Sequence, residues 1–196
     1  MLVAVINNCG NIYSVDYALR RLGIEPVLTT DPKILSKADK IIFPGQGEAS
    51  TTMQHLRESG LDQFILEWRK PFMGICIGMQ LMCNHSEEGD ADCLGIFDTK
   101  VTRFIPTSQR EKVPHMGWNS IYNLQTEFLP ANLENSYVYY VHSYYVALCK
   151  ETVATTDYTL PFSAALQKEN YYATQFHPEK SGSVGELILK KWLIEK

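Results

Sequence analysis

The feature that most constrains the fold is a series of short, continuous apolar runs, separated by turns and by apolar residues at helical spacing. The apolar runs are residues 2–6, 26–29, 40–43 and 72–75, and the helical stretches are residues 12–22, 48–58 and 61–68. Continuous apolar runs are typical of strands buried on both faces. Because strands that alternate with helices form a parallel sheet, the sequence predicts an α/β fold with a mainly parallel central sheet flanked by helices.

The second half of the chain has a different pattern. From about Lys100, segments rich in β-branched and aromatic residues follow one another without long helical stretches, at residues 101–104, 118–121 and 137–146. This pattern predicts additional antiparallel strands attached to the first sheet. Near the end of the chain, Ser183 and Glu186 form a capping-box pattern that predicts the start of a final helix. Because no internal repeat or long linker interrupts the chain, we expect one domain.

Composition narrows the class of protein. With 45% hydrophobic and 20% charged residues, the 196-residue chain is of ordinary globular composition, which excludes a disordered or fibrous protein. The net charge of −4 and the lack of a basic run disfavour nucleic acid as a partner. Five cysteines without a CxxC pair argue against disulfides and a zinc ribbon. Without a signal peptide or about 18 continuous apolar residues, we expect a cytoplasmic protein outside the membrane.

The segment PFMGICIGMQ at residues 71–80 predicts a nucleophile. An apolar strand runs into Gly74-x-Cys76-x-Gly78 and then into a helix, which is the spacing of a nucleophile elbow with cysteine in place of serine. A helix N-terminus favours the thiolate, and the amide of Ile77 is placed to donate to an oxyanion. The alternative is that Cys76 is a small core residue between close-packed glycines, because free cysteines are commonly buried.

A cysteine nucleophile needs a base and a group that orients this base. His177 is the best candidate of the five histidines, because it follows a strand-like segment in QFHPE at residues 175–179. Pro178 favours an extended His177, and in an extended chain residues i and i+2 project to the same side. We therefore expect Glu179 beside the imidazole. The alternative for this tripeptide is a surface turn.

Other residues have simpler interpretations. His55, His85 and His115 are expected on the solvated surface or in local hydrogen bonds. A metal site formed by Cys76, Cys83 and His85 fits the spacing but lacks a second pair of ligands, so no metal is expected. The glycine turn FPGQGE at residues 43–48 offers free backbone amides to an anion or oxyanion. A phosphate-binding loop is the alternative, but the lysine of that motif is absent.

Taken together, this glycine turn, GICIGMQ and QFHPE resemble the class I (triad) glutamine amidotransferases. Further motifs are similar to those of the glutaminase subunits of imidazole glycerol phosphate synthase, namely NCGN (8–11), PGQG (44–47), PHMGWN (114–119), YVHSY (140–144) and HPEKS (177–181). The resemblance covers essentially the whole chain. It implies one type 1 glutamine amidotransferase domain over residues 1–196, with a flavodoxin-like fold.

The resemblance also assigns expected roles to individual residues. It implies that Cys76 is the nucleophile, His177 the acid/base and Glu179 its partner. It places Gly45, Gln46 and Ile77 in the oxyanion region, Gln80, His142, Ser143 and Tyr144 around glutamine, and Asn11, Tyr139 and Lys180 at a subunit interface. Gln46 departs from the valine that is common in the family, which leaves the backbone amide in place. No cofactor and no metal are implied.

The implied activity is hydrolysis of L-glutamine through a cysteine thioester. The ammonia passes to a separate (β/α)₈ cyclase subunit in a heterodimer, and the cyclase makes imidazole glycerol phosphate and aminoimidazole carboxamide ribonucleotide in histidine biosynthesis. Following the family, we expect the isolated subunit to be nearly idle until the cyclase binds its nucleotide substrate.

Three alternatives remain open. Amidotransferase subunits for anthranilate or aminodeoxychorismate are weakened by PHMGWN and VHSYY, whereas a paralogue that serves surface-sugar amidination shares nearly the same motifs. The third alternative, a non-catalytic member of the fold, would normally lack Cys76, His177 or Glu179, and all three residues are present.

Overall fold

The computed structural model describes residues 1–7, 12–45, 47–108 and 111–194. Its centre is a seven-stranded sheet in the order β11-β12-β13-β4-β3-β1-β2. The parallel strands are β1 (Val3–Ile6), β2 (Val27–Thr29), β3 (Lys40–Gly45), β4 (Phe72–Cys76) and β13 (Tyr171–Thr174). Two antiparallel strands, β11 (Thr152–Asp157) and β12 (Pro161–Lys168), extend one edge. The prediction of a mainly parallel sheet with added antiparallel strands is therefore confirmed.

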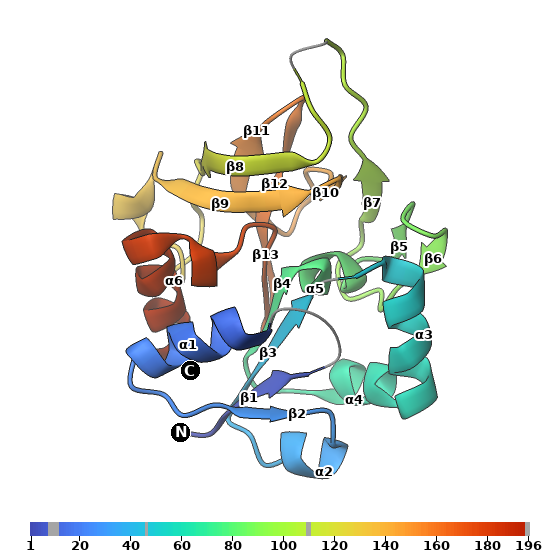
Figure 1. Cartoon of the computed structure of the whole chain (residues 1–196), viewed down its shortest axis with the longest axis vertical. Coiled ribbons are helices and arrows are strands. Elements are labelled where there is room, and N and C mark those ends of the chain that lie inside the picture. Colours follow the sequence, from blue (N-terminus) through green and yellow to red (C-terminus); the bar gives the residue numbers. More distant parts are fainter. Residues whose placement is uncertain (8–11, 46, 109–110, 195–196) are drawn as a thin grey trace.

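Helices cover both faces of this sheet (Figure 1). On one face lie α1 (Ile12–Arg21) and α6 (Gly182–Ile194), and on the other lie α3 (Ala49–Ser59), α4 (Leu61–Glu67) and the short α5 (Ile77–Leu81); α2 (Pro32–Leu35) follows β2. Successive side chains of β1 alternate between the two cores, with Val3 and Val5 on the α1 side and Ala4 and Ile6 on the α3 side. Burial on both faces explains the continuous apolar runs.

The aromatic segments of the second half form two further sheets, so the expectation that they attach to the first sheet is wrong. A four-stranded sheet contains β7 (Lys100–Arg103), β10 (Tyr144–Val146), β5 (His85–Ser86) and β6 (Ala91–Asp92), and a two-stranded ribbon contains β8 (His115–Ser120) and β9 (Tyr137–His142). The expected strand at residues 137–146 is split at Ser143 between these two sheets. Strand propensity is local, whereas the choice of partner strand is not.

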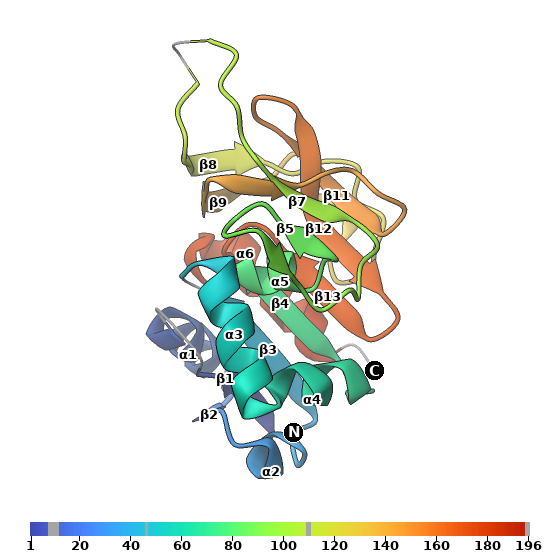
Figure 2. The same cartoon turned by 90° about the vertical axis from the view of Figure 1, so that its right-hand side faces the viewer.

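The β8–β9 ribbon lies beyond the carboxyl end of β4 in both views (Figures 1 and 2). The remaining elements are two short 3₁₀ helices, η1 (Ala131–Leu133) and η2 (Pro178–Lys180). Helix α6 begins at Gly182, so Ser183 lies within its first turn and the predicted capping box is wrong. Side-chain packing of Ile188 and Trp192 against the sheet, rather than the cap, holds this helix in place.

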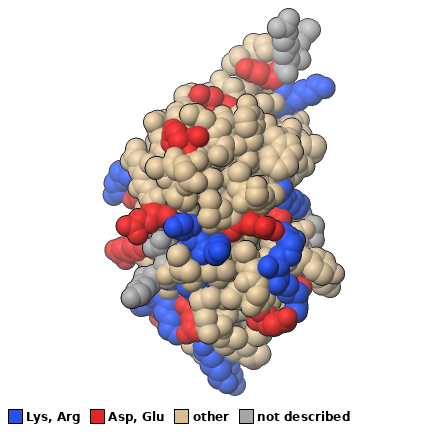
Figure 3. Space-filling view, turned by 90° about the vertical axis from the view of Figure 1, so that its left-hand side faces the viewer, with Lys and Arg blue, Asp and Glu red and all other residues tan. Residues whose placement is uncertain are grey.

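Two properties relevant to possible partners are the distribution of surface charge and the length of the helices. Acidic and basic side chains are intermixed over the face shown in Figure 3. None of the helices in the described part of the chain is both long and apolar enough to span a bilayer.

Candidate active site

Cys76 occupies a sharp turn between β4 and α5. Its φ of 56° and ψ of −111° lie outside the regions that ordinary residues favour, which costs about 1–3 kcal/mol. A Cβ atom on Gly78 would lie 2.1 Å from the carbonyl oxygen of Phe43, and one on Gly74 would lie 2.7 Å from the Gly78 carbonyl. Both glycines are therefore required by close backbone contacts. The predicted strand-to-helix turn is confirmed, with the cysteine at its tip.

His177 and Glu179 lie next to each other at the end of β13. The Nδ1 atom of His177 is 2.8 Å from Oε1 of Glu179, and both side chains are almost fully buried. The expected proximity is confirmed, but its geometric reason differs, because Pro178 starts the η2 turn instead of continuing an extended chain. The turn brings the carboxylate against the ring.

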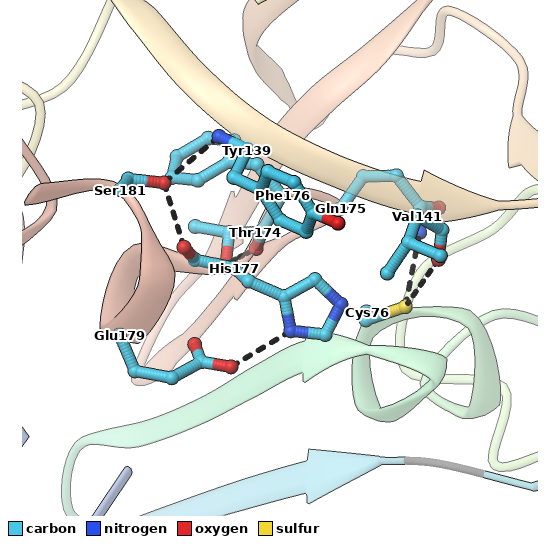
Figure 4. A network of polar contacts seen from close by, with 9 residues as sticks. All are labelled: Cys76, Tyr139, Val141, Thr174, Gln175, Phe176, His177, Glu179 and Ser181. Atoms are coloured by element: carbon cyan, nitrogen blue, oxygen red, sulfur yellow. Dashed lines mark hydrogen bonds and ion pairs between the residues drawn. The ribbon is translucent and has the colours of Figure 1, made fainter. Parts of the chain in front are cut away.

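Figure 4 shows the imidazole of His177 between Glu179 and Cys76. The Nε2 atom of His177 is buried, has no hydrogen-bond partner among the described residues and lies on the ring edge that faces the Cys76 sulfur. Burial is the largest influence on this ring and opposes its charged form, but the Cys76 sulfur and the Glu179 carboxylate outweigh it and raise the pKa of His177 to about 10. The arrangement favours a charged His177 ring between the carboxylate and the sulfur.

Backbone contacts hold the His177 turn against β9. The amide of His177 donates to the carbonyl oxygen of Tyr139 at 2.9 Å. The hydroxyl of Ser181 donates to the His177 carbonyl at 2.6 Å and accepts from the amide of Tyr139 at 3.0 Å (Figure 4). The β8–β9 ribbon and the parallel sheet are therefore joined directly behind the imidazole.

A cavity of about 310 Å³ opens onto Cys76. Most of the predicted site residues line it, namely Gly45, Cys76, Ile77, Gln80, His142, Ser143, Tyr144 and His177. Gly45 is paired with Cys76 across β3 and β4, which places the glycine turn next to the sulfur. Gln46 lies outside the described residues. The cavity has the size expected of a site for a small ligand.

Comparison with known proteins agrees with this geometry. The family model described as "Glutamine amidotransferase class-I" matches residues 4–196. The chain belongs to this family. It is 62% identical over 98% of its length, and 99% of the relative's, to "Imidazole glycerol phosphate synthase subunit HisH" of Bacteroides fragilis strain YCH46. It is 43% identical to the protein of the same name from Pasteurella multocida, over 97% of this chain and 96% of that one.

The solved structures show the same fold. A crystal structure of a glutamine amidotransferase superposes with a TM-score of 0.76 at 20% identity, covering 98% of this chain and 97% of the other. The recognised resemblance to class I glutamine amidotransferases is confirmed, and so is the expected fold class.

Glu88 is a residue of this amidotransferase site that sequence reasoning missed. It lines the cavity and accepts a hydrogen bond from the amide of Ala49 at 3.1 Å. Burial, its largest influence, raises the pKa of Glu88. The carboxylate lies in a loop without a recognisable motif, so only the tertiary structure identifies it. Among the described residues that line the cavity, it is the one acidic side chain.

Gln80 has less freedom than predicted. Its Nε2 atom donates to the carbonyl oxygen of Tyr144 and to Oε1 of Gln175, both at 2.9 Å. Because an amide nitrogen carries only two hydrogens, the side chain retains only its carbonyl oxygen for a ligand. Gln80 can therefore accept a hydrogen bond from glutamine but cannot donate one.

His115 is not on the solvated surface, but it makes the local hydrogen bond that was the other expectation, with Asn119 at 3.3 Å. It is 4% exposed, its Nδ1 atom lies 2.9 Å from Nε2 of His142, and its ring stacks on Tyr140 and Tyr158. Facing aromatic rings from β9 and a neighbouring loop exclude solvent there. Burial lowers the pKa of His115 to about 4 and that of His142 to about 3. His55 is exposed, and His85 contacts the nearby Asp92, as expected.

Three sets of residues from the sequence analysis remain, namely the expected interface residues, the cysteines and the considered metal ligands. Tyr139 and Lys180 are both half-buried and flank the His177 turn, whereas Asn11 lies outside the described residues. The cysteines Cys76, Cys83, Cys93 and Cys149 are free thiols. Among the described residues, no three potential ligands are grouped to hold a metal ion, so the considered set of Cys76, Cys83 and His85 does not form such a site.

Proposed function

We propose that this chain is the glutaminase subunit of an imidazole glycerol phosphate synthase, and that Cys76, His177 and Glu179 hydrolyse L-glutamine. The observation that carries the proposal is the alignment of sulfur, imidazole and carboxylate at an open cavity. The similarity to relatives named HisH supports the histidine pathway.

The mechanism starts from the thiolate–imidazolium pair. The Cys76 thiolate attacks the side-chain amide carbon of glutamine, a C–S bond forms, and the carbonyl oxygen becomes an oxyanion. Backbone amides of Gly45, Gln46 and Ile77 are the proposed donors to this oxyanion. His177 gives its proton to the amide nitrogen, the C–N bond breaks and ammonia leaves.

Hydrolysis of the thioester regenerates the enzyme. Neutral His177 removes a proton from water, and the hydroxide adds to the thioester carbon. The C–S bond then breaks, which releases glutamate and the Cys76 thiolate. Glu179 holds the Nδ1 proton of His177 throughout and stabilises the ring whenever it is charged.

The cavity offers partners for the polar groups of glutamine. We assign the α-ammonium group to Glu88, because a carboxylate is the natural partner of an ammonium ion. The carbonyl oxygen of Gln80 and the segment of His142, Ser143 and Tyr144 surround the rest of the substrate. No cofactor or metal takes part in these steps.

The proposed partner is the (β/α)₈ cyclase subunit, in a cytoplasmic heterodimer. Ammonia is mostly protonated at neutral pH and is then a poor nucleophile, so a protected transfer is required. Large apolar side chains on the β8–β9 ribbon support a protein partner, because Met116, Trp118 and Tyr137 are 56–63% exposed. Tyr139 and Lys180 continue this surface toward the site, and Asn11 is the third proposed contact residue.

Glutaminase assays on the purified subunit, with and without the cyclase and its nucleotide substrate, test the proposal. We expect glutamate release to rise strongly in the complex and to fall to background in Cys76→Ala. Cys93→Ala, which removes a cysteine outside the cavity, is the matched control and should retain wild-type turnover.

Unchanged glutamate release in Cys76→Ala would refute the nucleophile. Equal rates with and without the liganded cyclase would refute the regulated pairing. Stimulation only by an enzyme of surface-sugar amidination would assign the chain to that pathway instead.

A further inference from the structure

Gln175 lies next to the proposed nucleophile without an assigned role. It directly follows β13, in which Thr174 pairs with Ile75 of β4, so the register places Gln175 beside Cys76. The side chain is 0% exposed, and its Nε2 atom donates to the Cys76 sulfur at 3.7 Å (Figure 4). This distance is normal for a hydrogen bond to sulfur. A fully buried amide that is aimed at a reactive atom requires an explanation.

The neighbouring hydrogen bonds determine which end of the Gln175 amide faces the sulfur. The Tyr144 carbonyl can only accept, so Gln80 must turn its NH₂ group toward it. The second hydrogen of that NH₂ group is donated to Gln175, so the Gln175 atom that accepts it must be the amide oxygen Oε1. The NH₂ group of Gln175 is therefore the end that faces Cys76, and a flipped amide would break the bond to Gln80.

A second chain of hydrogen bonds, through His115 and His142, also ends on the Tyr144 carbonyl. The Nδ1 atom of His142 lies 2.7 Å from the Tyr144 oxygen and must be the donor, so Nε2 of His142 accepts from Nδ1 of His115. The other ring nitrogen of His115 then accepts from Asn119 at 3.3 Å. With both rings neutral, each hydrogen bond has one possible direction. The Tyr144 carbonyl is thus a fixed anchor for both chains of hydrogen bonds.

We propose that Gln175 is a positioning residue that holds the Cys76 sulfur as a thiolate facing His177. An N–H donor stabilises a negative sulfur more than a neutral one, because hydrogen bonds to ions are about twice as strong as those between neutral groups. The sulfur also lies 3.9 Å from the Val141 carbonyl, a contact that favours the neutral S–H form. The N–H donor of Gln175 favours the thiolate and therefore counteracts the contact with the Val141 carbonyl. The inference rests on the proposed role of Cys76 as the nucleophile.

A purely structural role for Gln175 makes a different prediction. If the amide only fills the core, Gln175→Met and Gln175→Glu should lower activity only through a loss of stability and should leave the pH dependence of Cys76 alkylation unchanged. If the amide stabilises a thiolate, Gln175→Glu should be the worse change, because it places a carboxylate oxygen against the sulfur. Gln175→Met removes the donor at similar length without adding charge.

The experiment measures the pH dependence of Cys76 alkylation by iodoacetamide in the full chain, without glutamine, with the labelled cysteine identified by peptide mass spectrometry. In Gln175→Met the pH of half-maximal rate should rise by about one unit, and the rise should be larger in Gln175→Glu. Other titratable groups that line the cavity, Glu88, His142, Tyr144 and His177, are unchanged in these variants. Glutaminase kcat in the cyclase complex should fall about tenfold or more.

Gln167→Met is the matched control, because it removes a glutamine amide from the same sheet, where Gln167 bonds Thr126 away from the cavity. Its alkylation profile should match the wild type. Gln80→Met removes the donor to Gln175 and leaves Gln175 itself unchanged. It should also raise the pH of half-maximal Cys76 alkylation. Folding of each variant is checked by near-UV circular dichroism.

Wild-type alkylation profiles in Gln175→Met and Gln80→Met would overturn the inference. Higher kcat in Gln175→Glu than in Gln175→Met would also overturn it, because a carboxylate beside the sulfur would then not disfavour the thiolate. Either result leaves the nucleophile intact as long as Cys76→Ala abolishes glutaminase activity. Full activity of Cys76→Ala would instead refute the proposed function.

Discussion

Two buried histidines line the same cavity, and their surroundings shift their pKa values in opposite directions. His177 is 4% exposed and His142 is 6% exposed, yet the surroundings raise the pKa of the first to about 10 and lower that of the second to about 3. Burial disfavours the charged ring in both cases. The difference comes from the partners, because His177 faces a carboxylate and a sulfur, whereas His142 faces a carbonyl and the neutral His115.

This contrast separates two functions within one site. A histidine that gains and loses a proton is suited to acid/base chemistry, as proposed for His177. A histidine that stays neutral has fixed donor and acceptor nitrogens, and it can therefore hold a backbone carbonyl in one orientation. His142 and His115 belong to this second kind.

Replacing the charged histidine should have the largest effect. In His177→Asn no group remains to protonate the departing ammonia or to activate water, so glutaminase kcat in the cyclase complex should fall by about 10³-fold. Steady-state glutamate release measures this change. A kcat within threefold of wild type would show that His142 or another group can replace His177, which would end the proposed division of roles.

Removing the carboxylate should have the next largest effect. Glu179→Gln retains a hydrogen-bond acceptor for Nδ1 but removes the negative charge, so the pKa of His177 should fall and kcat should drop about 10- to 100-fold. Histidine side-chain NMR titration follows the ring directly. The His142 resonances should not change, and an equal change in both rings would indicate a general rearrangement of the site.

The smallest expected effect is on the pH dependence of stability. His115 and His142 take up protons more readily when unfolded, near pH 6.5, than when folded, near pH 4 and pH 3. Their contribution to the free energy of unfolding is therefore present above pH 6.5 and lost as the pH falls toward these values. His177 has the opposite sign, because its contribution is present below pH 6.5 and lost as the pH rises toward 10.

Urea unfolding between pH 4 and pH 7.5 measures the acid side. His115→Gln, which no longer titrates, should lose less stability between these pH values than the wild type. Gln63→Glu on the exposed surface of α4 would serve as a variant that leaves the slope near neutral pH unchanged. Parallel pH profiles in His115→Gln and wild type would contradict the assignment of a neutral buried pair.

Much of the fold and part of the site follow from local sequence. Continuous apolar runs predicted the parallel strands, because burial on both faces leaves no polar position. Gly74 and Gly78 predicted the turn at Cys76, since only glycine allows these backbones to approach so closely. His177 and Glu179 were found from a tripeptide, although the turn at Pro178, not an extended chain, brings them together.

Other features depend on contacts between distant segments. Three strand segments of the second half were recognised, at residues 101–104, 118–121 and 137–146, but β11 and β12 were not. The partners of the recognised strands were not predicted either, because pairing is decided by the whole molecule. Glu88 carries no motif, and Gln175 lies in QFHPE but had no role predicted from it. Only the tertiary structure places Glu88 at the cavity and the Gln175 amide beside Cys76. His115 was expected on the surface or in a local hydrogen bond, whereas the rings of Tyr140 and Tyr158 bury it.

The amino-acid sequence alone therefore determined the fold class, the family resemblance and the three residues proposed as the triad, because apolar periodicity, glycine spacing and short motifs act over a few neighbouring residues. The tertiary structure decided the direction in which the pKa of each of the three buried histidines is shifted and the direction of the hydrogen bonds that reach Cys76. Charge and hydrogen-bond direction depend on which groups surround an atom, and these groups come from strands and loops up to 99 residues apart in the chain.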